Sequence, residues 1–192
     1  MYNRKPLLGV GINDSDTITT KDGVRCNVYM KWKSIINRVY SKKALMKKPQ
    51  YEDVQVSPEW LYFSKFKSWF LDQRGCDNKD FQIDKDLLSG ELKIYSPDTC
   101  VLVPREINFF LIGSDKCGGS HLKGVTFHKN TMKFKSQISV NGVKKTLGTF
   151  TDEYSAHLSF KEAKESEAKR LAEKWKDKID PRAYEALINY QV

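Results

Sequence analysis

The segment from Val125 to Phe150 most constrains the fold, because its apolar and polar side chains alternate with a period of two around a tight turn. One face of the central run holds Phe134, Ile138 and Val140. The Asn141-Gly142 pair favours a two-residue hairpin, since both turn positions need a positive φ. The sequence therefore predicts a three-stranded antiparallel sheet. A helix after Asp152 would pack on this sheet through Ala156, Phe160 and Ala163.

The other face of this predicted sheet is polar and lacks acidic residues. Residues 116–150 carry seven Lys and no Asp or Glu, whereas residues 51–115 have a net charge of −5. Soluble sheet faces usually mix both signs of charge, and an ordinary solvated face is the alternative interpretation. Segregated positive charge is typical of a surface for phosphates. We predict that this face binds double-stranded DNA, with RNA as an alternative. The predicted contacts are Thr126, His128, Lys133, Lys135, Gln137, Ser139, Lys144, Lys145 and Thr146.

Three motifs follow one another here: GVTFHKN, KFKSQISVNG and KKTLGTFTDEYSAHLSF. They resemble the apetala-type (ethylene-response) DNA-binding domain, most closely at Gly124-Val125 and at Leu147-Gly148-Thr149-Phe150. The resemblance implies that the sheet enters the major groove with the face named above. Where that family has Arg and Trp, this chain has Thr, Ser and Lys. We expect a looser sequence preference, because Thr and Ser cannot make the bidentate guanine contacts of Arg.

The middle of the chain contains IDKDLLSGELKIYSPDTCVLVPREIN, which predicts strand, loop, strand and helix. This segment resembles the HNH nuclease family, in which a strand ends in Asp-His and a helix supplies a final His or Asn. The resemblance implies that Asp84 and Asn108 hold one divalent cation, and it places Lys85 where the general base stands. Carboxylate and amide oxygens suit Mg²⁺, with Mn²⁺ as an alternative.

Lys85 departs from the nuclease pattern, because a protonated Lys cannot accept a proton and its ordinary pKa is about 10.4. Three interpretations stay open. The chain is a diverged endonuclease or nickase that uses another base, such as Asp86. It binds metal and DNA without cutting, as a regulator or a host-takeover factor. Or the motif is structural only, with Asp84 and Lys85 forming a local ion pair.

Two helices are predicted in the N-terminal half, after loops and short strands over residues 1–28. Residues 28–40 place apolar side chains at helical spacing with Lys and Arg between them, and we expect this basic helix to grip the DNA backbone. Ser57 is expected to cap a second helix, with Pro58 in its first turn. Its aromatic stripe predicts core packing rather than base stacking: Trp60, Phe63, Phe66 and Phe70.

The predicted fold class is α+β, a diverged HNH-like ββα region followed by the three-stranded sheet packed on a helix. We expect an N-terminal region at 1–113, a linker at 114–120, a DNA-binding domain at 121–176 and a C-terminal helix at 177–192. The chain from about Met30 onward resembles bacteriophage HNH homing-endonuclease-like proteins with a C-terminal apetala-type domain. The shared landmarks are Trp32, Arg38, Tyr40, Val56 to Trp60, Phe63, Phe66, Trp69, Asp84 to Asp86, Tyr95 to Pro97, Thr99-Cys100, Val103-Pro104, Asn108 and Asp180 to Leu187.

Targeting features predict where the protein works. The four cysteines include no CxxC pair, which argues against a zinc site or a disulfide scaffold. No apolar run reaches the ~18 residues of a membrane helix, and the first residues lack a signal-peptide core. We therefore expect no membrane association and a cytoplasmic location, in an infected bacterial host if the phage resemblance holds. A host protein would be a further partner of unknown identity.

Overall fold

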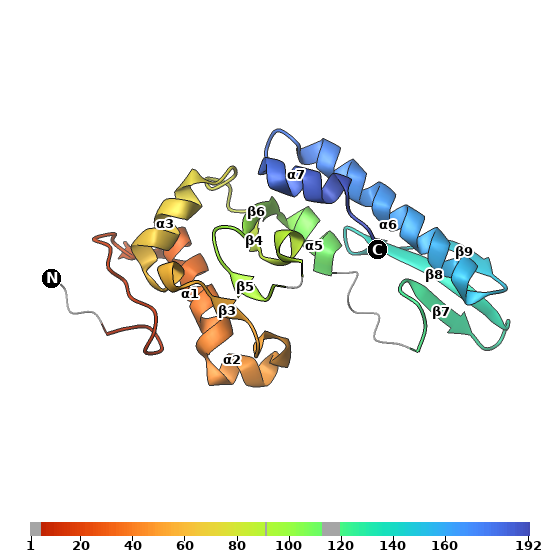
Figure 1. Cartoon of the computed structure of the whole chain (residues 1–192), viewed down its shortest axis with the longest axis horizontal. Helices are drawn as coiled ribbons and strands as arrows, with labels where there is room; N and C mark the ends of the chain where they lie inside the picture. The colour runs from red at the N-terminus through yellow and green to blue at the C-terminus, as the bar shows by residue number, and fades with distance from the viewer. Residues whose placement is uncertain (1–4, 91, 113–119) are drawn as a thin grey trace. The chain divides into compact units, whose positions relative to one another are not determined.

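A computed structural model describes residues 5–90, 92–112 and 120–192. The chain divides into two compact units, Met1–Leu102 and Val103–Val192. Its elements mix α and β, as predicted, and include a three-stranded antiparallel sheet (Figure 1). The linker predicted at 114–120 lies, except for Ser120, outside the described residues.

The core of the first unit is built from two amphipathic helices. Helix α1 spans Asn27–Tyr40 and α3 spans Phe63–Asp72, while the short α2 spans Lys42–Lys47 and a 3-10 turn, η1, spans Pro49–Tyr51. Trp32 of α1 is buried, and its Nε1 donates to the carbonyl of Trp60 at 2.8 Å. The aromatic stripe lies in the core, which confirms that prediction: Trp60, Phe63, Phe66 and Phe70 are all buried.

The predicted start of the second helix is wrong, because Ser57 makes no side-chain cap hydrogen bond. Residues Pro58–Leu61 form a 3-10 turn, η2, and α3 begins only at Phe63. The interruption comes from the N-terminal segment. The Ile12 amide donates to the Leu61 carbonyl at 2.7 Å, and the Phe63 amide donates to the Ile12 carbonyl at 2.9 Å. This bridge takes backbone groups that a continuous helix would need.

Short strands complete the first unit. Strands β1 (Thr20–Lys21) and β2 (Val24–Arg25) form an antiparallel ribbon. Strand β3 (Gln55–Val56) pairs in parallel with β5 (Ile94–Tyr95). Strand β4 (Phe81–Asp84) pairs with β6 (Val101–Pro104), and the one-turn helix α4 (Asp86–Ser89) follows β4. From β4 onward the chain forms α4, β5, β6 and α5 (Arg105–Ile112) in that order, and the strand at Ile94–Tyr95 pairs with β3. The HNH-like arrangement of these elements stays a prediction.

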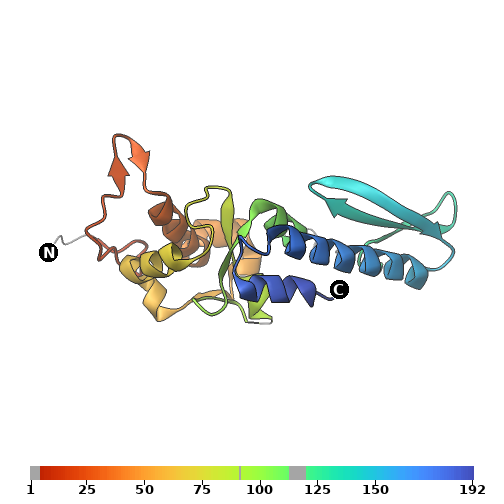
Figure 2. The ribbon, with the colours of Figure 1, turned by 90° about the horizontal axis from the view of Figure 1, so that it is seen from above.

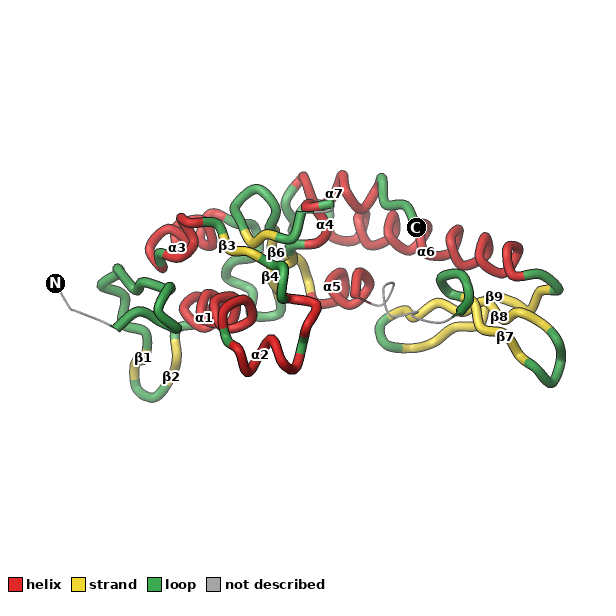
Figure 3. Tube along the Cα trace, turned by 60° about the horizontal axis from the view of Figure 1, so that its bottom comes forward, coloured by secondary structure: helices red, strands yellow, loops and turns green. Residues whose placement is uncertain are grey.

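The second unit packs one long helix on the three-stranded sheet. The sheet order is β7 (Val125–His128), β8 (Lys133–Val140) and β9 (Val143–Phe150). Helix α6 (Glu153–Trp175) covers one face, and α7 (Pro181–Ile188) lies back along α6 (Figures 2 and 3). Asp152 caps α6 as predicted, accepting from the Ser155 amide at 2.8 Å. None of the described helices has the length and hydrophobicity that a membrane span requires.

The buried stripe of α6 differs from the prediction at its centre. Ala156 and Phe160 are buried, but the next buried position is Lys164 rather than Ala163, which is only half-buried. A step of four residues from Phe160 reaches position 164, because i and i+4 share a helix face. The Lys164 ammonium donates to the carbonyl of Phe110 on α5, and it lies 3.7 Å from the centroid of the Phe110 ring. Helix α5 therefore packs with α6 in the second unit, whereas the sequence placed it in the N-terminal region.

Candidate nucleic-acid interface

The register of the sheet decides which side chains share its free face. Directly paired residues of neighbouring strands point to the same side. Thr126 pairs with Lys135 and His128 with Lys133 between β7 and β8. Gln137 pairs with Thr146 and Ser139 with Lys144 between β8 and β9. The eight residues carried over from the DNA-binding resemblance thus lie on one face, opposite the apolar positions that pack on α6.

Strand β9 contains a bulge that sequence periodicity did not predict. Ser136 pairs with Gly148 but Gln137 pairs with Thr146, so Leu147 has no partner on β8. Beyond the bulge the parity of β9 changes, and Thr149 pairs with Lys135 on the free face. Thr149 is a ninth residue of the same surface. Gly148 was the available signal, since glycine inside a strand often marks an irregularity.

Lys145 does not join this surface. It pairs with Ile138, which is buried toward α6, so Lys145 lies on the α6 side of the edge strand. The prediction had grouped Lys145 with Lys144, although adjacent residues of a strand point to opposite sides. The structure therefore brings together eight of the nine predicted DNA contacts and separates the ninth.

We use "polar sheet face" for the nine residues that share the free side: Thr126, His128, Lys133, Lys135, Gln137, Ser139, Lys144, Thr146 and Thr149. Lys135 and Gln137, at its centre, are half-buried, and the other seven are exposed. No ion pair joins Lys133, Lys135 or Lys144 to any residue that the structure describes. The Gln137 amide donates to the Thr146 hydroxyl at 3.4 Å across the strands. The face is thus a set of cations and neutral hydrogen-bonding groups with no acidic member.

A second candidate site surrounds Asp84 at the end of β4. Its Oδ1 accepts from the Asp86 amide at 3.0 Å and from the Leu87 amide at 2.8 Å, so Asp84 fixes the start of α4. Asp84 is only 5% exposed. Burial raises the pKa of the Asp84 carboxyl, although the hydrogen bond from the Leu87 amide opposes the shift. A buried carboxyl with a raised pKa is one mark of a functional site.

Lys85 pairs with Asp86 rather than with Asp84. Its ammonium donates to Asp86 Oδ1, and its side chain is 9% exposed while that of Asp86 is 69% exposed. The local ion pair expected between Asp84 and Lys85 is therefore replaced by one between Lys85 and Asp86. The Lys85 ammonium also lies 5.9 Å from the centroid of the Tyr95 ring. Lys85 thus has a carboxylate partner and an aromatic neighbour, and a role as general base stays a prediction.

A set of largely buried polar side chains lies next to Asp84, Lys85 and Asp86, the three residues that we call the Asp84 corner. The Tyr95 hydroxyl accepts from Arg38 Nη1 at 2.7 Å, and burial raises the pKa of Tyr95. Burial alone would lower the pKa of Arg38, but Tyr95, Tyr51 and Asp86 together outweigh burial and raise it. Burial also raises the pKa of the Cys100 thiol to about 12, so Cys100 is an inert core residue. Arg38, Tyr95 and Cys100, which are far apart in the sequence, thus meet next to Asp84 and Lys85.

The metal pair expected from the resemblance is divided between the units. Asp84 belongs to the first unit, and the half-buried Asn108, which has an interaction of its own, lies on α5 in the second. Across residues 5–90, 92–112 and 120–192, no three His, Cys, Asp or Glu side chains gather to hold a metal ion. A shared site of Asp84 and Asn108 stays a prediction.

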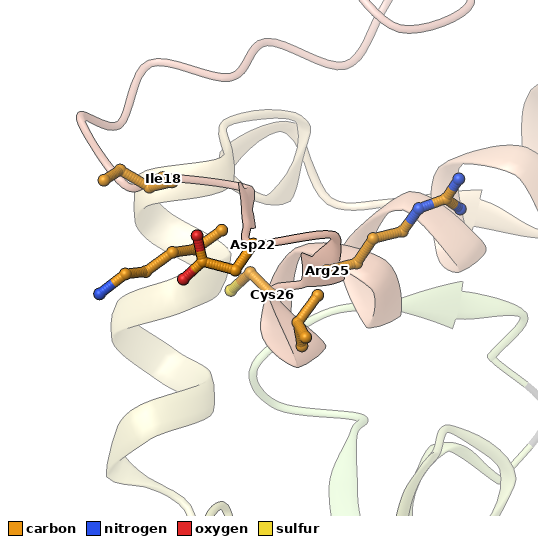
Figure 4. Close-up of a pocket in the computed structure, with 6 residues that line it drawn as sticks. Ile18, Asp22, Arg25 and Cys26 are labelled. Atoms are coloured by element: carbon orange, nitrogen blue, oxygen red, sulfur yellow. The ribbon is translucent and has the colours of Figure 1, made fainter.

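One open hollow of about 390 Å³ lies at the β1–β2 ribbon and contains none of the predicted site residues. Its lining is Ile18, Lys21, Asp22, Val24, Arg25 and Cys26. Figure 4 shows the Arg25 side chain extending away from Asp22. The hollow therefore gathers no convergent set of polar groups, and it gives no sign of a particular ligand.

Comparison of the chain with protein-family models, with curated proteins and with solved structures finds no match. A functional assignment therefore has to come from the chain's own residues. Two features carry the most information. They are the polar sheet face of the second unit and the Asp84 corner of the first.

Proposed function

We propose that this protein binds double-stranded DNA through the polar sheet face. The observation that carries the proposal is the register of β7, β8 and β9, which puts three Lys, one His and five uncharged polar side chains on one uncovered face. A surface of this composition complements the phosphate backbone. It also matches the resemblance of this segment to apetala-type DNA-binding domains, which use a three-stranded sheet.

The chemistry of the face suggests how DNA would be held. Sheet strands fit the major groove of B-form DNA. Lys133, Lys135 and Lys144 would contact phosphates or guanine, and Gln137 can donate to and accept from adenine. No Arg lies on the face, so the strongest bidentate guanine contact is missing. The proposal therefore includes modest sequence discrimination.

Neighbouring lysines of β9 provide the test, because Lys144 lies on the polar sheet face and Lys145 lies on the other side. Lys144→Gln should weaken binding to a mixed-sequence duplex and lower the slope of log Kd against log salt by ~0.9, the value for one phosphate contact. Lys145→Gln removes the same charge and should leave most of that slope. Fluorescence anisotropy across a KCl series measures both. Equal effects of the two substitutions would contradict binding by this face.

We propose endonuclease or nickase activity of HNH type as a second function. The buried Asp84 corner and the succession of β4, β6 and α5 support this proposal. The residues fit Mg²⁺ only in part. Both hydrogen bonds to the Asp84 carboxylate end on Oδ1, and Mg²⁺ accepts one or two carboxylates together with waters and substrate phosphates. Bound Mg²⁺, or Mn²⁺, would polarise the scissile phosphodiester. Asp84, with Asn108 as the second ligand, would hold it.

Within this proposal the three residues of the corner have different roles. Lys85, paired with Asp86, would contribute positive charge to the site. Asp86, the more exposed carboxylate, would be the proton acceptor for an attacking water. If Asp86 stays bound to Lys85, no base is present and the protein binds DNA without cutting it, as a regulator or a factor acting on a bacterial host.

A plasmid-nicking assay separates these two possibilities. Supercoiled plasmid is incubated with the protein and Mg²⁺ or Mn²⁺, beside Asp84→Asn and Asp86→Asn. Asp84→Asn keeps an oxygen for the α4 cap, so loss of nicking with retained DNA binding would support a metal role for Asp84. Absence of nicking by the unaltered protein in either metal, together with tight DNA binding, would sink the nuclease proposal and leave the binding protein.

A further inference from the structure

The N-terminal half contains a second strongly basic segment. Residues 23–51 carry eight Lys or Arg side chains and no Asp or Glu. The sequence assigned this charge to the helix at 28–40, but two of the cations of α1 are used inside the first unit. Lys31 donates to the Phe81 carbonyl at 2.6 Å, and Arg38 donates to the Tyr95 hydroxyl. Burial also lowers the pKa of Lys31.

Apart from Arg25 on β2, the exposed cations of this segment lie on or directly after α2, the short helix that follows α1 (Figure 3). Lys42, Lys43 and Lys47 are exposed, as is Lys48 just after the helix, while Ala44 and Leu45 are half-buried. No residue in the described parts of the chain forms an ion pair with any of these four lysines. Positions i, i+3 and i+4 share a helix face, so Lys43, Met46 and Lys47 lie together.

Met46 is the unusual member of this face, because 84% of it is exposed. A long apolar side chain surrounded by lysines gains nothing from folding of the unit. Such a side chain does gain from contact with the sugars and bases of a duplex, and DNA-binding proteins use Met among the apolar residues that they insert into the minor groove. The lysines around it would meanwhile neutralise phosphates on either strand.

We propose that this α2 face, formed by Lys42, Lys43, Met46 and Lys47, is a second contact surface for duplex DNA on the first unit. The proposal rests on the proposed DNA-binding function and adds a partner surface that the polar sheet face does not include. Charge complementarity indicates the occupant, since three lysines without an ion-pair partner among the described residues and no acid match a polyanion. Anionic lipid headgroups share this charge, so vesicles form one arm of the test.

The experiment uses the full chain and three triple variants that remove the same charge. Lys42→Gln/Lys43→Gln/Lys47→Gln changes the α2 face, and Lys133→Gln/Lys135→Gln/Lys144→Gln changes the polar sheet face. Lys21→Gln/Lys65→Gln/Lys79→Gln changes three exposed lysines elsewhere on the first unit. Binding to a mixed-sequence duplex is measured across a KCl series. The α2 variant should lose ~2.7 units of salt slope, at about 0.9 per phosphate, and the last variant much less.

The outcomes distinguish failure of this inference from failure of the proposed function. If the sheet variant loses slope and the α2 variant matches the control variant, the α2 proposal is overturned and sheet binding stands. If only the α2 variant loses slope, the α2 proposal stands and the sheet proposal falls. Retained duplex binding by the α2 variant, with loss of binding to phosphatidylserine vesicles that the unaltered protein binds, assigns the face to lipid and overturns the proposal.

Met46→Ala tests the apolar part of the surface separately. It removes no charge, so the salt slope should stay constant while affinity falls several-fold. The side chain is exposed, so its loss should leave the melting temperature unchanged. Affinity equal to that of the unaltered protein would show that Met46 does not contact DNA, and the proposal would fail in that respect.

Discussion

Two opposing effects act on the ionisation of the Asp84 carboxyl. It is a buried carboxylate, which costs free energy when ionised, and it accepts two backbone amides, which favours ionisation. Burial prevails, so the pKa of its carboxyl is raised. Ionisation of Asp84 would therefore place a negative charge that folding alone does not favour next to a paired lysine. A bound cation would compensate this charge.

The raised pKa of Asp84 predicts how stability depends on pH. The folded protein keeps the proton of this carboxyl at pH values where the unfolded chain, near its ordinary pKa of 3.8, has lost it. Stability contributed by Asp84 therefore falls as pH rises from about 4 to the folded pKa. Asp84→Asn keeps the capping oxygen and removes this effect. Its unfolding free energy, relative to that of the unaltered protein, should rise over this pH window in urea titrations.

The exposed Asp80 supplies the control for this measurement, because Asp80→Asn also removes one negative charge near β4. Its difference from the unaltered protein should change little with pH. If the Asp84→Asn difference were equally flat, the carboxyl would be no harder to ionise in the folded protein than in the unfolded chain. The account of Asp84 given above would then be wrong.

At the scale of elements, helices and strands were predicted best where a single hydrophobic periodicity or a clear turn or cap signal was present. Helix α1, the β8 strand, the Asn141-Gly142 turn and the Asp152 cap all follow from local chemistry, and the structure confirms them. The prediction failed where a distant segment intervened. The pairing of Ile12 with Tyr62 splits a helix into η2 and α3, and no local pattern around Ser57 encodes that contact.

The candidate sites show the same limit. Alternation along β8 predicted the polar sheet face, and the bulge in β9 added Thr149 to it, whereas Lys145 is excluded by ordinary alternation with Lys144. Asp84 and Lys85 were found from their motif, but the sequence did not predict that both are buried, or that Lys85 pairs with Asp86 and lies near the Tyr95 ring. Lys164 was missed because a charged residue in a buried stripe contradicts the pattern that identifies such stripes.

Gly124, just before β7, packs closely against Phe160 of α6, which predicts the effect of replacing this glycine. Gly124 has φ +77, and a Cβ there would lie 2.0 Å from Cγ of Phe160. Gly124→Ala should therefore lower the unfolding free energy by about 2–4 kcal/mol, through backbone strain and overpacking together. Gly142→Ala is the matched control, since its φ is +79 and its Cβ would meet nothing within 4 Å. It should cost about 1 kcal/mol. Equal losses in denaturant titrations would contradict close packing at Gly124.

For the whole molecule, positive charge is divided between the two units. The second unit carries the polar sheet face, and the first carries the α2 face, with a net negative stretch at 51–115 between the two basic segments of the sequence. If both faces bind one duplex, attachment of one raises the effective concentration of the other. Two surfaces of moderate affinity would then suffice for tight binding without strong sequence selection by either.

The bulge at Leu147 limits the insertions and deletions that β9 can accept. Residues 143 to 146 and residues 148 to 150 of β9 are out of phase with each other, and the single extra residue reconciles them. An insertion or deletion of one residue in β9 would therefore exchange inside and outside for half of the strand. Homologous chains that keep both the lysine at 144 and the aromatic residue at 150 should preserve their spacing even where the intervening side chains have diverged.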